Sequence, residues 1–256
     1  MVNLKMKLQN KLNSFFPDAI DSEILILGTG PTLRKGMQFV EKTNFQGTII
    51  SLKQSYLELE GYSGKILHLV NPWNYQRYIP HKNSQTFTIY IDDCWAKFKP
   101  NKEDFDWYLL TNYISNDNLK ESVLANFNFE KYYISNQTDD LRPLMPGIFA
   151  EALYIALALK VKKIHIFGVD YNRINNCGNT HFYDKSYIIN KLLKVISKPL
   201  FMKKAFNLMK IRTEYSHASL HEQEVAIPGI TNFINYIEIN HKVKINGWMH
   251  RKNDKN

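Results

Sequence analysis

Residues 22–33 read Ser-Glu-Ile-Leu-Ile-Leu-Gly-Thr-Gly-Pro-Thr-Leu, a short apolar run followed directly by a glycine-rich turn. The run from Ile24 to Leu27 has the length and composition of a buried strand. Gly28 to Leu33 is typical of a tight turn that leads into a helix. A strand, a glycine-rich turn and a helix in this order predict the first unit of an α/β fold with a parallel sheet.

Further elements extend this prediction along the chain. Gly147–Leu159 is apolar almost all round, so we expect a buried helix that feeds a strand at 164–167. A helix that feeds a strand in this way implies parallel strands joined by right-handed crossovers. Residues 228–237 predict the last helix. The other predicted strands are 48–52, 65–70, 86–91, 107–110, 132–135 and 242–245.

The composition is that of a single globular domain. Of the 256 residues, 44% are hydrophobic and 22% are charged, which argues against a disordered chain. The length suits one domain over 1–256, and no repeat or low-complexity block divides it. Residues 172–220 are polar, basic and weakly periodic. That stretch fits a lid or an acceptor-binding insertion, and it equally fits an ordinary helical excursion.

The net charge of +9 favours an anionic partner. No zinc-finger spacing or RNA-binding aromatic signature is present, so we expect no nucleic-acid partner. The basic tail at 250–255 is either a solvated end or a weak anchor on an anionic membrane. Residues 4–16 have the pattern of an amphipathic helix, which either packs on its own domain or lies at a membrane interface.

The sequence indicates a cytoplasmic protein. Its N-terminus lacks the apolar core of a signal peptide, and no stretch is long and apolar enough to span a bilayer. Cys94 and Cys177 are far apart and lie in no metal-type pattern, so free thiols in a reducing compartment are the simplest interpretation. Peripheral contact with the inner membrane stays open.

The turn formed by Gly28, Thr29, Gly30 and Pro31 indicates a nucleotide or phosphate nearby. Leu33 occupies the position of the third glycine of the dinucleotide fingerprint, and the Lys-Ser/Thr of a P-loop is missing. Both NAD and ATP are therefore disfavoured. A purely structural turn between strand and helix is the alternative.

Other polar residues follow predicted strands, where open α/β sheets bind ligands. Gln54 and Asn71 could bind a ribose or a base edge, or simply form turns. Asp170, after Gly168, could accept from a ribose or from a backbone turn. The segment 142–147 reads Arg-Pro-Leu-Met-Pro-Gly, and its two prolines fix an extended conformation. Arg142 could bind a carboxylate or a phosphate, and Gly147 would let a ligand approach the start of the helix.

Two short patterns bear on chemistry. His217 and His221 are four residues apart, so they share a helical face, and either could act as a general base. The intervening Glu of a zinc-protease motif is missing, so a zinc site is disfavoured. Asp104-Phe-Asp106 matches the Asp-x-Asp of metal-dependent sugar transferases, but the pattern is common by chance. Surface side chains are the alternative for all four residues.

Taken in order, these motifs resemble the bacterial sialyltransferases of glycosyltransferase family 42, over roughly 24–245. The family has Gly-Asn-Gly-Pro-Ser-Leu, Asn-Gln and Asn-Pro after successive strands. Then come an Arg before a Gly-started apolar helix, Ser-Gly-Ile-Asp-Phe after a strand, and Ser-His-x-x-x-His. This chain has, in the same order, Gly28–Leu33, Lys53-Gln54, Asn71-Pro72, Arg142, Gly147–Leu159, Phe167–Tyr171 and Ser216–His221.

The resemblance implies a Rossmann-like parallel sheet flanked by helices, a variant of the GT-A type, with a small lid at 172–220. It implies inverting, metal-independent transfer from a CMP-activated acidic sugar to a cell-surface glycan such as lipopolysaccharide or capsule. His221 corresponds to the base, while Tyr171 and His181 would support the leaving phosphate. No resident cofactor or metal is implied, and we expect a homo-oligomer.

The chain departs from the family at several positions. Thr29 and Lys53 stand where the family has asparagines, and Arg142 lies one residue further from its glycine. Asn172 and His181 stand where it has two tyrosines. The departures leave the donor open among sialic acid, Kdo and other nonulosonates. Two other functions also stay open: an ATP-dependent enzyme similar to pterin diphosphokinases, which share the loop, and a CMP-sugar-binding protein without catalysis.

Overall fold

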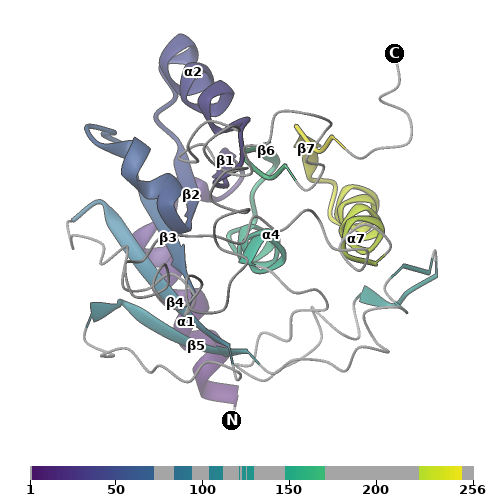
Figure 1. Ribbon diagram of the computed structural model, residues 1–256. Helices are drawn as coiled ribbons and strands as arrows, with labels where there is room; N and C mark the ends of the chain where they lie inside the picture. The colour runs from purple at the N-terminus through teal and green to yellow at the C-terminus, as the bar shows by residue number, and fades with distance from the viewer. Residues whose placement is uncertain are drawn as a thin grey trace, which may run out of the picture.

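The computed structural model describes residues 2–71, 84–93, 104–111, 121, 123, 124, 126–129, 148–170 and 225–249. These ranges form an α/β fold built on one parallel sheet (Figure 1). The strands are β1 (Glu23–Leu27), β2 (Thr48–Leu52), β3 (Ile66–Val70), β4 (Thr86–Asp93), β5 (Trp107–Thr111), β6 (Lys163–Phe167) and β7 (Lys244–Asn246). The helices are α1 (Val2–Phe15), α2 (Leu33–Thr43), α4 (Ile148–Ala158) and α7 (Ile227–Asn240), with 3₁₀ helices η1 (Pro17–Ala19) and η2 (Lys53–Leu59).

The strand order β5-β4-β3-β2-β1-β6-β7 decides where a ligand can bind. All six strand pairs are parallel. From β1 the chain adds strands in one direction as far as β5, and it then returns to place β6 on the free side of β1. The order therefore reverses between β1 and β6, which makes this a Rossmann-like sheet. Open α/β sheets bind ligands outside the carboxyl ends of the strands at such a switch point.

Helices pack against the sheet on both faces (Figure 1). Because side chains alternate between the two faces of a strand, each face has its own core. On one face, Ile24, Ile26 and Ile50 pack in the larger core with residues of α1, α4 and α7. On the other face, Leu25, Leu27 and Ile49 pack with residues of α2. The near-continuous apolar strands are what a parallel sheet covered on both sides requires.

The N-terminal helix packs on its own domain, one of the two outcomes that its pattern left open. Leu12 is 1% exposed and Phe16 is fully buried in the larger core. Lys65 lies over the ring of Phe15, with Nζ 4.5 Å from the ring centroid. In the described part of the chain, no helix has the length and hydropathy needed to cross a bilayer.

The predicted strands at 48–52, 65–70, 86–91, 107–110, 164–167 and 242–245 are confirmed, each within two residues at either end. The predicted helices at 4–16, 147–159 and 228–237 are confirmed within three residues. The predicted strand at 132–135 and the lid at 172–220 lie outside the described residues.

Candidate functional site

The loops after β1 and β6 meet at the switch point of the sheet. Leu27 and Phe167 are paired in the register of the two strands, so the residues that follow them leave the sheet side by side. The backbone N–H of Gly28 donates to the carbonyl oxygen of Phe167 at 2.8 Å. The N–H of Gly30 donates to the carbonyl oxygen of Gly168 at 2.7 Å. Two backbone hydrogen bonds therefore tie the two predicted ligand loops to each other.

This close approach depends on the absence of side chains at two positions. A Cβ on Gly28 would lie 2.2 Å from the carbonyl oxygen of Gly168, and a Cβ on Gly168 would lie 2.3 Å from that of Gly28. Gly168 also has φ +71°, a left-handed conformation that side chains disfavour. Sterically, only glycine fits at either position.

Thr32 and Asp170 lock the two loops together. One carboxylate oxygen of Asp170 accepts the backbone N–H of Thr32 at 2.8 Å, and the other accepts its hydroxyl at 2.7 Å. The same hydroxyl oxygen accepts the N–H of Gly168 at 2.8 Å. Asp170 therefore holds a backbone turn, one of its two predicted roles. A carboxylate has further lone pairs, so the other role, contact with a ribose, stays a prediction.

The start of α2 already has an anion in front of it, because the carboxylate of Asp170 accepts the N–H and the hydroxyl of Thr32 there. The first turn itself contains no acidic residue, and Arg34 and Lys35 are exposed in it. A phosphate beside this turn would therefore meet the two positive side chains together with the negative charge of Asp170.

The sequence reading missed the role of Gly36, in the first two turns of α2. A Cβ there would lie 2.7 Å from Cδ2 of Leu27 and 2.8 Å from Cβ of Phe167. Gly36 thus brings α2 tightly against β1 and β6, the function of the third glycine in dinucleotide folds. The sequence does contain this third glycine, but it lies three residues after the position, Leu33, that the dinucleotide fingerprint assigns to it.

Two predicted ligand residues follow the neighbouring strands on the other side of β1. Gln54 comes two residues after β2 and is 6% exposed, and Asn71 directly follows β3. Their amide oxygens, Oε1 and Oδ1, are buried and have no hydrogen-bond partner among the described residues. Because buried polar atoms are usually paired, such oxygens at a ligand-binding edge are candidates for ligand contacts.

Ser55 links Gln54 to the glycine loop. Its hydroxyl donates to the carbonyl oxygen of Leu27 at 2.7 Å, and it accepts the backbone N–H of Leu52 at 2.9 Å. The residue after Gln54 is therefore anchored one residue before Gly28. Along the carboxyl edge of the sheet, the candidate site runs from Asn71 through Gln54 and Gly28 to Gly168.

The Asp-x-Asp pattern lies elsewhere. Asp106 immediately precedes β5, so it is at the amino end of the sheet. Its carboxylate accepts the backbone N–H of Thr88 at 2.7 Å. Asp106 thus extends the edge pairing between β4 and β5 and is remote from the switch point. Within the described ranges, no three His, Cys, Asp or Glu side chains are grouped as metal ligands would be.

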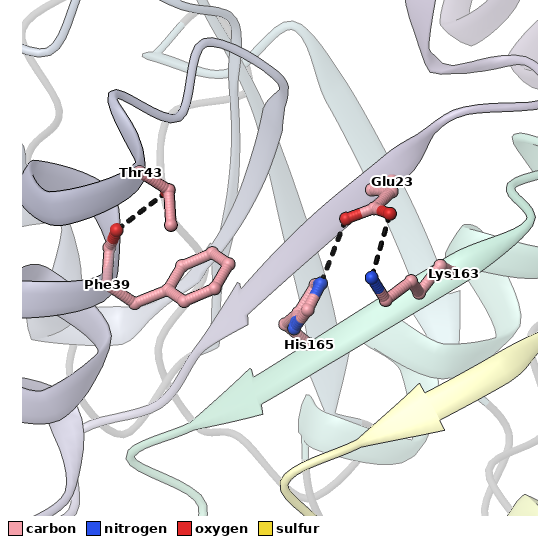
Figure 2. Close-up of polar contacts among 5 residues, drawn as sticks. All are labelled: Glu23, Phe39, Thr43, Lys163 and His165. Atoms are coloured by element: carbon pink, nitrogen blue, oxygen red, sulfur yellow. Dashed lines mark hydrogen bonds and ion pairs between the residues drawn. The ribbon is translucent and has the colours of Figure 1, made fainter.

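A second polar cluster also lies toward the amino ends of the strands, beneath α2 (Figure 2). Glu23 accepts from Nζ of Lys163 at 2.8 Å and is 3.1 Å from Nε2 of His165. The His165 ring packs on Phe39, with centroids 4.7 Å apart. The hydrogen bonds from Lys163 and His165 lower the pKa of Glu23. This cluster joins β1, β6 and α2 and takes no part in the candidate site.

The remaining predicted site residues, Arg142, Gly147, Tyr171, His181 and His221, lie outside the described residues. Thr29 and Pro31 are part of the glycine loop, Thr29 between the two backbone contacts and Pro31 directly after the second. The described residues consequently include part of the predicted substrate-binding set, and the roles of all the predicted site residues stay predictions.

Comparison with known proteins gives little further. No protein-family model matches the sequence, and no curated protein matches it. The solved structures that it resembles include the MAf glycosyltransferase from Magnetospirillum magneticum AMB-1, with a TM-score of 0.39 and 13% sequence identity. The match covers 65% of this chain and 25% of that one, so the chain matches only about a quarter of that protein's length. A likeness this distant assigns no activity to the chain.

Proposed function

We propose that this chain is an inverting glycosyltransferase that transfers an acidic sugar from a CMP-activated donor to a cell-surface glycan. One observation carries the proposal. Gly28–Thr32, Gln54, Asn71 and Gly168–Asp170 lie along a single edge of the sheet, at and beside its switch point. These are the motifs whose order in the sequence resembles family 42.

The chemistry of this edge suits a nucleoside monophosphate ester. Arg34 and Lys35, exposed in the first turn of α2 directly after the glycine loop, offer positive charge to one phosphate. The buried amide oxygens of Gln54 and Asn71 can only accept hydrogen bonds. Ribose hydroxyls and the exocyclic amino group of cytosine can donate hydrogen bonds, so they could pair with these oxygens.

The proposed reaction uses residues beyond the described ranges. The acceptor hydroxyl attacks the anomeric carbon as the bond from that carbon to the phosphate oxygen breaks, and the configuration inverts. His221 takes the hydroxyl proton. His181 and Tyr171 donate hydrogen bonds to the departing CMP phosphate, the charge stabilisation that a metal provides in other transferases. Arg142 would bind the donor carboxylate, next to Gly147 at the start of α4.

The test is CMP release with EDTA present, from CMP-sialic acid and CMP-Kdo in separate assays. His221→Ala is compared with His217→Ala, a matched variant from the same Ser-His-x-x-x-His segment. We expect release from one donor, a loss of at least about 100-fold in H221A, the lower range of a general base, and little change in H217A. Equal rates in wild type and H221A would remove His221 from the mechanism.

Each alternative function has its own companion assay. ATP turnover that requires Mg²⁺, measured without EDTA, would favour the enzyme similar to pterin diphosphokinases. CMP binding without release, with acceptor glycans added, would favour a binding protein. Cytoplasmic location, membrane contact and self-association belong to the proposal too. Cosedimentation with anionic vesicles and light scattering test the last two.

A further inference from the structure

His68 is a fully buried side chain with no assigned part in the proposed chemistry. It lies in the middle of β3, and its Nε2 is 2.9 Å from the backbone carbonyl oxygen of Lys53. Because a carbonyl oxygen only accepts, Nε2 must carry the proton. Nδ1 is then a bare acceptor, and it is buried without a hydrogen-bond partner among the described residues.

The imidazole contacts the segment after β2 at two points. Besides the Lys53 carbonyl, its ring stacks on Tyr56, with centroids 4.6 Å apart and an interplanar angle of 19°. Lys53 and Tyr56 are three residues apart, one turn, in the same short 3₁₀ helix, η2. Burial lowers the pKa of His68 to about 4, so the ring is neutral at physiological pH and keeps the tautomer that this contact needs.

The segment held in this way is strained. Lys53 has φ +55°, in the left-handed region that residues with a side chain rarely adopt. Strained conformations persist only where the surrounding structure over-determines them, and they cluster at functional sites. Here the left-handed residue turns the chain away from β2, and the next residue is Gln54, whose amide oxygen is buried at the site.

We infer that His68 is a positioning residue that holds the Lys53 turn and so presents the amide of Gln54 to the nucleotide. The inference rests on the proposed function for the identity of that ligand. His68 lies within β3, three residues before Asn71, which follows the strand. Because His68 does not itself reach the carboxyl edge of the sheet, it acts through Gln54. The unpaired Nδ1 costs stability, which is consistent with an imidazole retained for the turn and not for packing.

A double-mutant cycle tests the inference. The affinities of wild type, His68→Leu, Gln54→Leu and the double variant are measured by calorimetry with CMP, UMP, AMP and GMP. We expect H68L to weaken binding of the preferred nucleotide about tenfold, the factor that one hydrogen bond typically represents. In the Q54L background the same change should cost little, because the residue through which His68 acts is already missing.

His68→Gln is the matched control, since its amide N–H can reach the Lys53 carbonyl in place of the imidazole. H68Q should retain most of the affinity, and urea unfolding should show all variants folded. Two outcomes would overturn the role of His68 and leave the proposed function standing. One is an equal loss of affinity in H68L and H68Q, and the other is an H68L effect of the same size in the wild-type and Q54L backgrounds. A wild type that binds none of the four nucleotides would instead overturn the proposed function, and with it this use of the turn.

Discussion

Thr32 and Asp170 are 138 residues apart in the sequence, yet two hydrogen bonds of 2.8 and 2.7 Å join them across the switch point. The Thr32 hydroxyl also accepts from the backbone of Gly168, so one side chain bridges both loops. The loops are consequently pre-organised before any ligand arrives. Pre-organised backbone favours binding because less conformational freedom is lost in the complex.

Replacing Thr32 with valine tests this bridge, because the two side chains have the same shape. Thr32→Val leaves the N–H of Gly168 and one oxygen of Asp170 without their partner. We expect a loss of about 1–3 kcal/mol in the free energy of unfolding, measured with urea, and weaker CMP binding. Thr32→Ser keeps the hydroxyl and should stay near wild type. A T32V variant as stable as T32S would show that the bridge contributes nothing.

A pair of glycine substitutions separates steric clash from backbone strain. Gly168 and Gly61 both have positive φ, +71° and +81°. A Cβ on Gly168 would meet the carbonyl of Gly28, whereas a Cβ on Gly61 would meet nothing within 4 Å. We expect Gly61→Ala to cost about 1–2 kcal/mol of unfolding free energy, the left-handed penalty alone.

Gly168→Ala adds a collision between backbones to that penalty. We expect a loss of more than about 4 kcal/mol or an insoluble product, and no detectable CMP binding in any folded fraction. The measurement is urea unfolding of both variants beside wild type. If the two alanine variants were equally stable, the close approach of the β1 and β6 loops would be wrong.

The sequence was sufficient to predict the strands of the sheet and the residues at which several of them end, for a physical reason. Strands buried on both faces are runs of Ile, Leu and Val, and a glycine-rich turn marks where the first of them ends. The ends of β2 and β3 were equally visible, so Gln54 and Asn71 could be named as candidates from their position alone.

Contacts between distant segments could not be predicted in the same way. The bond from Thr32 to Asp170, the stacking of His68 on Tyr56 and the packing of Gly36 on Phe167 depend on the strand order. Local periodicity carries no information about which strand lies beside β1. The left-handed Lys53 was also hidden, because a lysine shows no preference for that conformation in its sequence.

Gln54 should show opposite effects on stability and on binding. Its buried, unpaired amide oxygen costs free energy in the ligand-free protein. We expect Gln54→Leu to leave the free energy of unfolding unchanged or to raise it by about 1 kcal/mol, while weakening CMP binding. Urea unfolding and calorimetry on the same sample measure both quantities.

Thr86→Val is the matched control for that substitution. Thr86 is 4% exposed, and its hydroxyl is likewise buried without a partner among the described residues, but it lies at the amino end of β4. The valine variant should gain similar stability and bind CMP as tightly as wild type. A Q54L variant that binds normally would remove Gln54 from the site.

His68 should make stability depend on pH in a defined window. Burial lowers its pKa from 6.5 to about 4, so between these values the unfolded chain binds the proton and the folded one does not. The free energy of unfolding therefore has its full His68 contribution above pH 6.5, and this contribution is lost as the pH is lowered toward 4. The shift corresponds to about 3 kcal/mol. Urea unfolding of wild type and H68Q at pH 7, 6, 5 and 4 measures it, and the difference between them should grow on acidification.

Glu23 affects stability at a lower pH than His68 does, so the contributions of the two residues can be distinguished. Its pKa is lowered from 4.5 by hydrogen bonds from Lys163 and His165, so its contribution is present above pH 4.5 and is lost as the pH falls below that value. The carboxylate is half exposed, and the effect should be small because solvent screens such pairs. Glu23→Gln should be less stable than wild type by a small, constant amount from pH 7 to 5, and the difference should shrink as the pH falls below 4.5. If E23Q instead removed the dependence between pH 6.5 and 5, that dependence would not belong to His68.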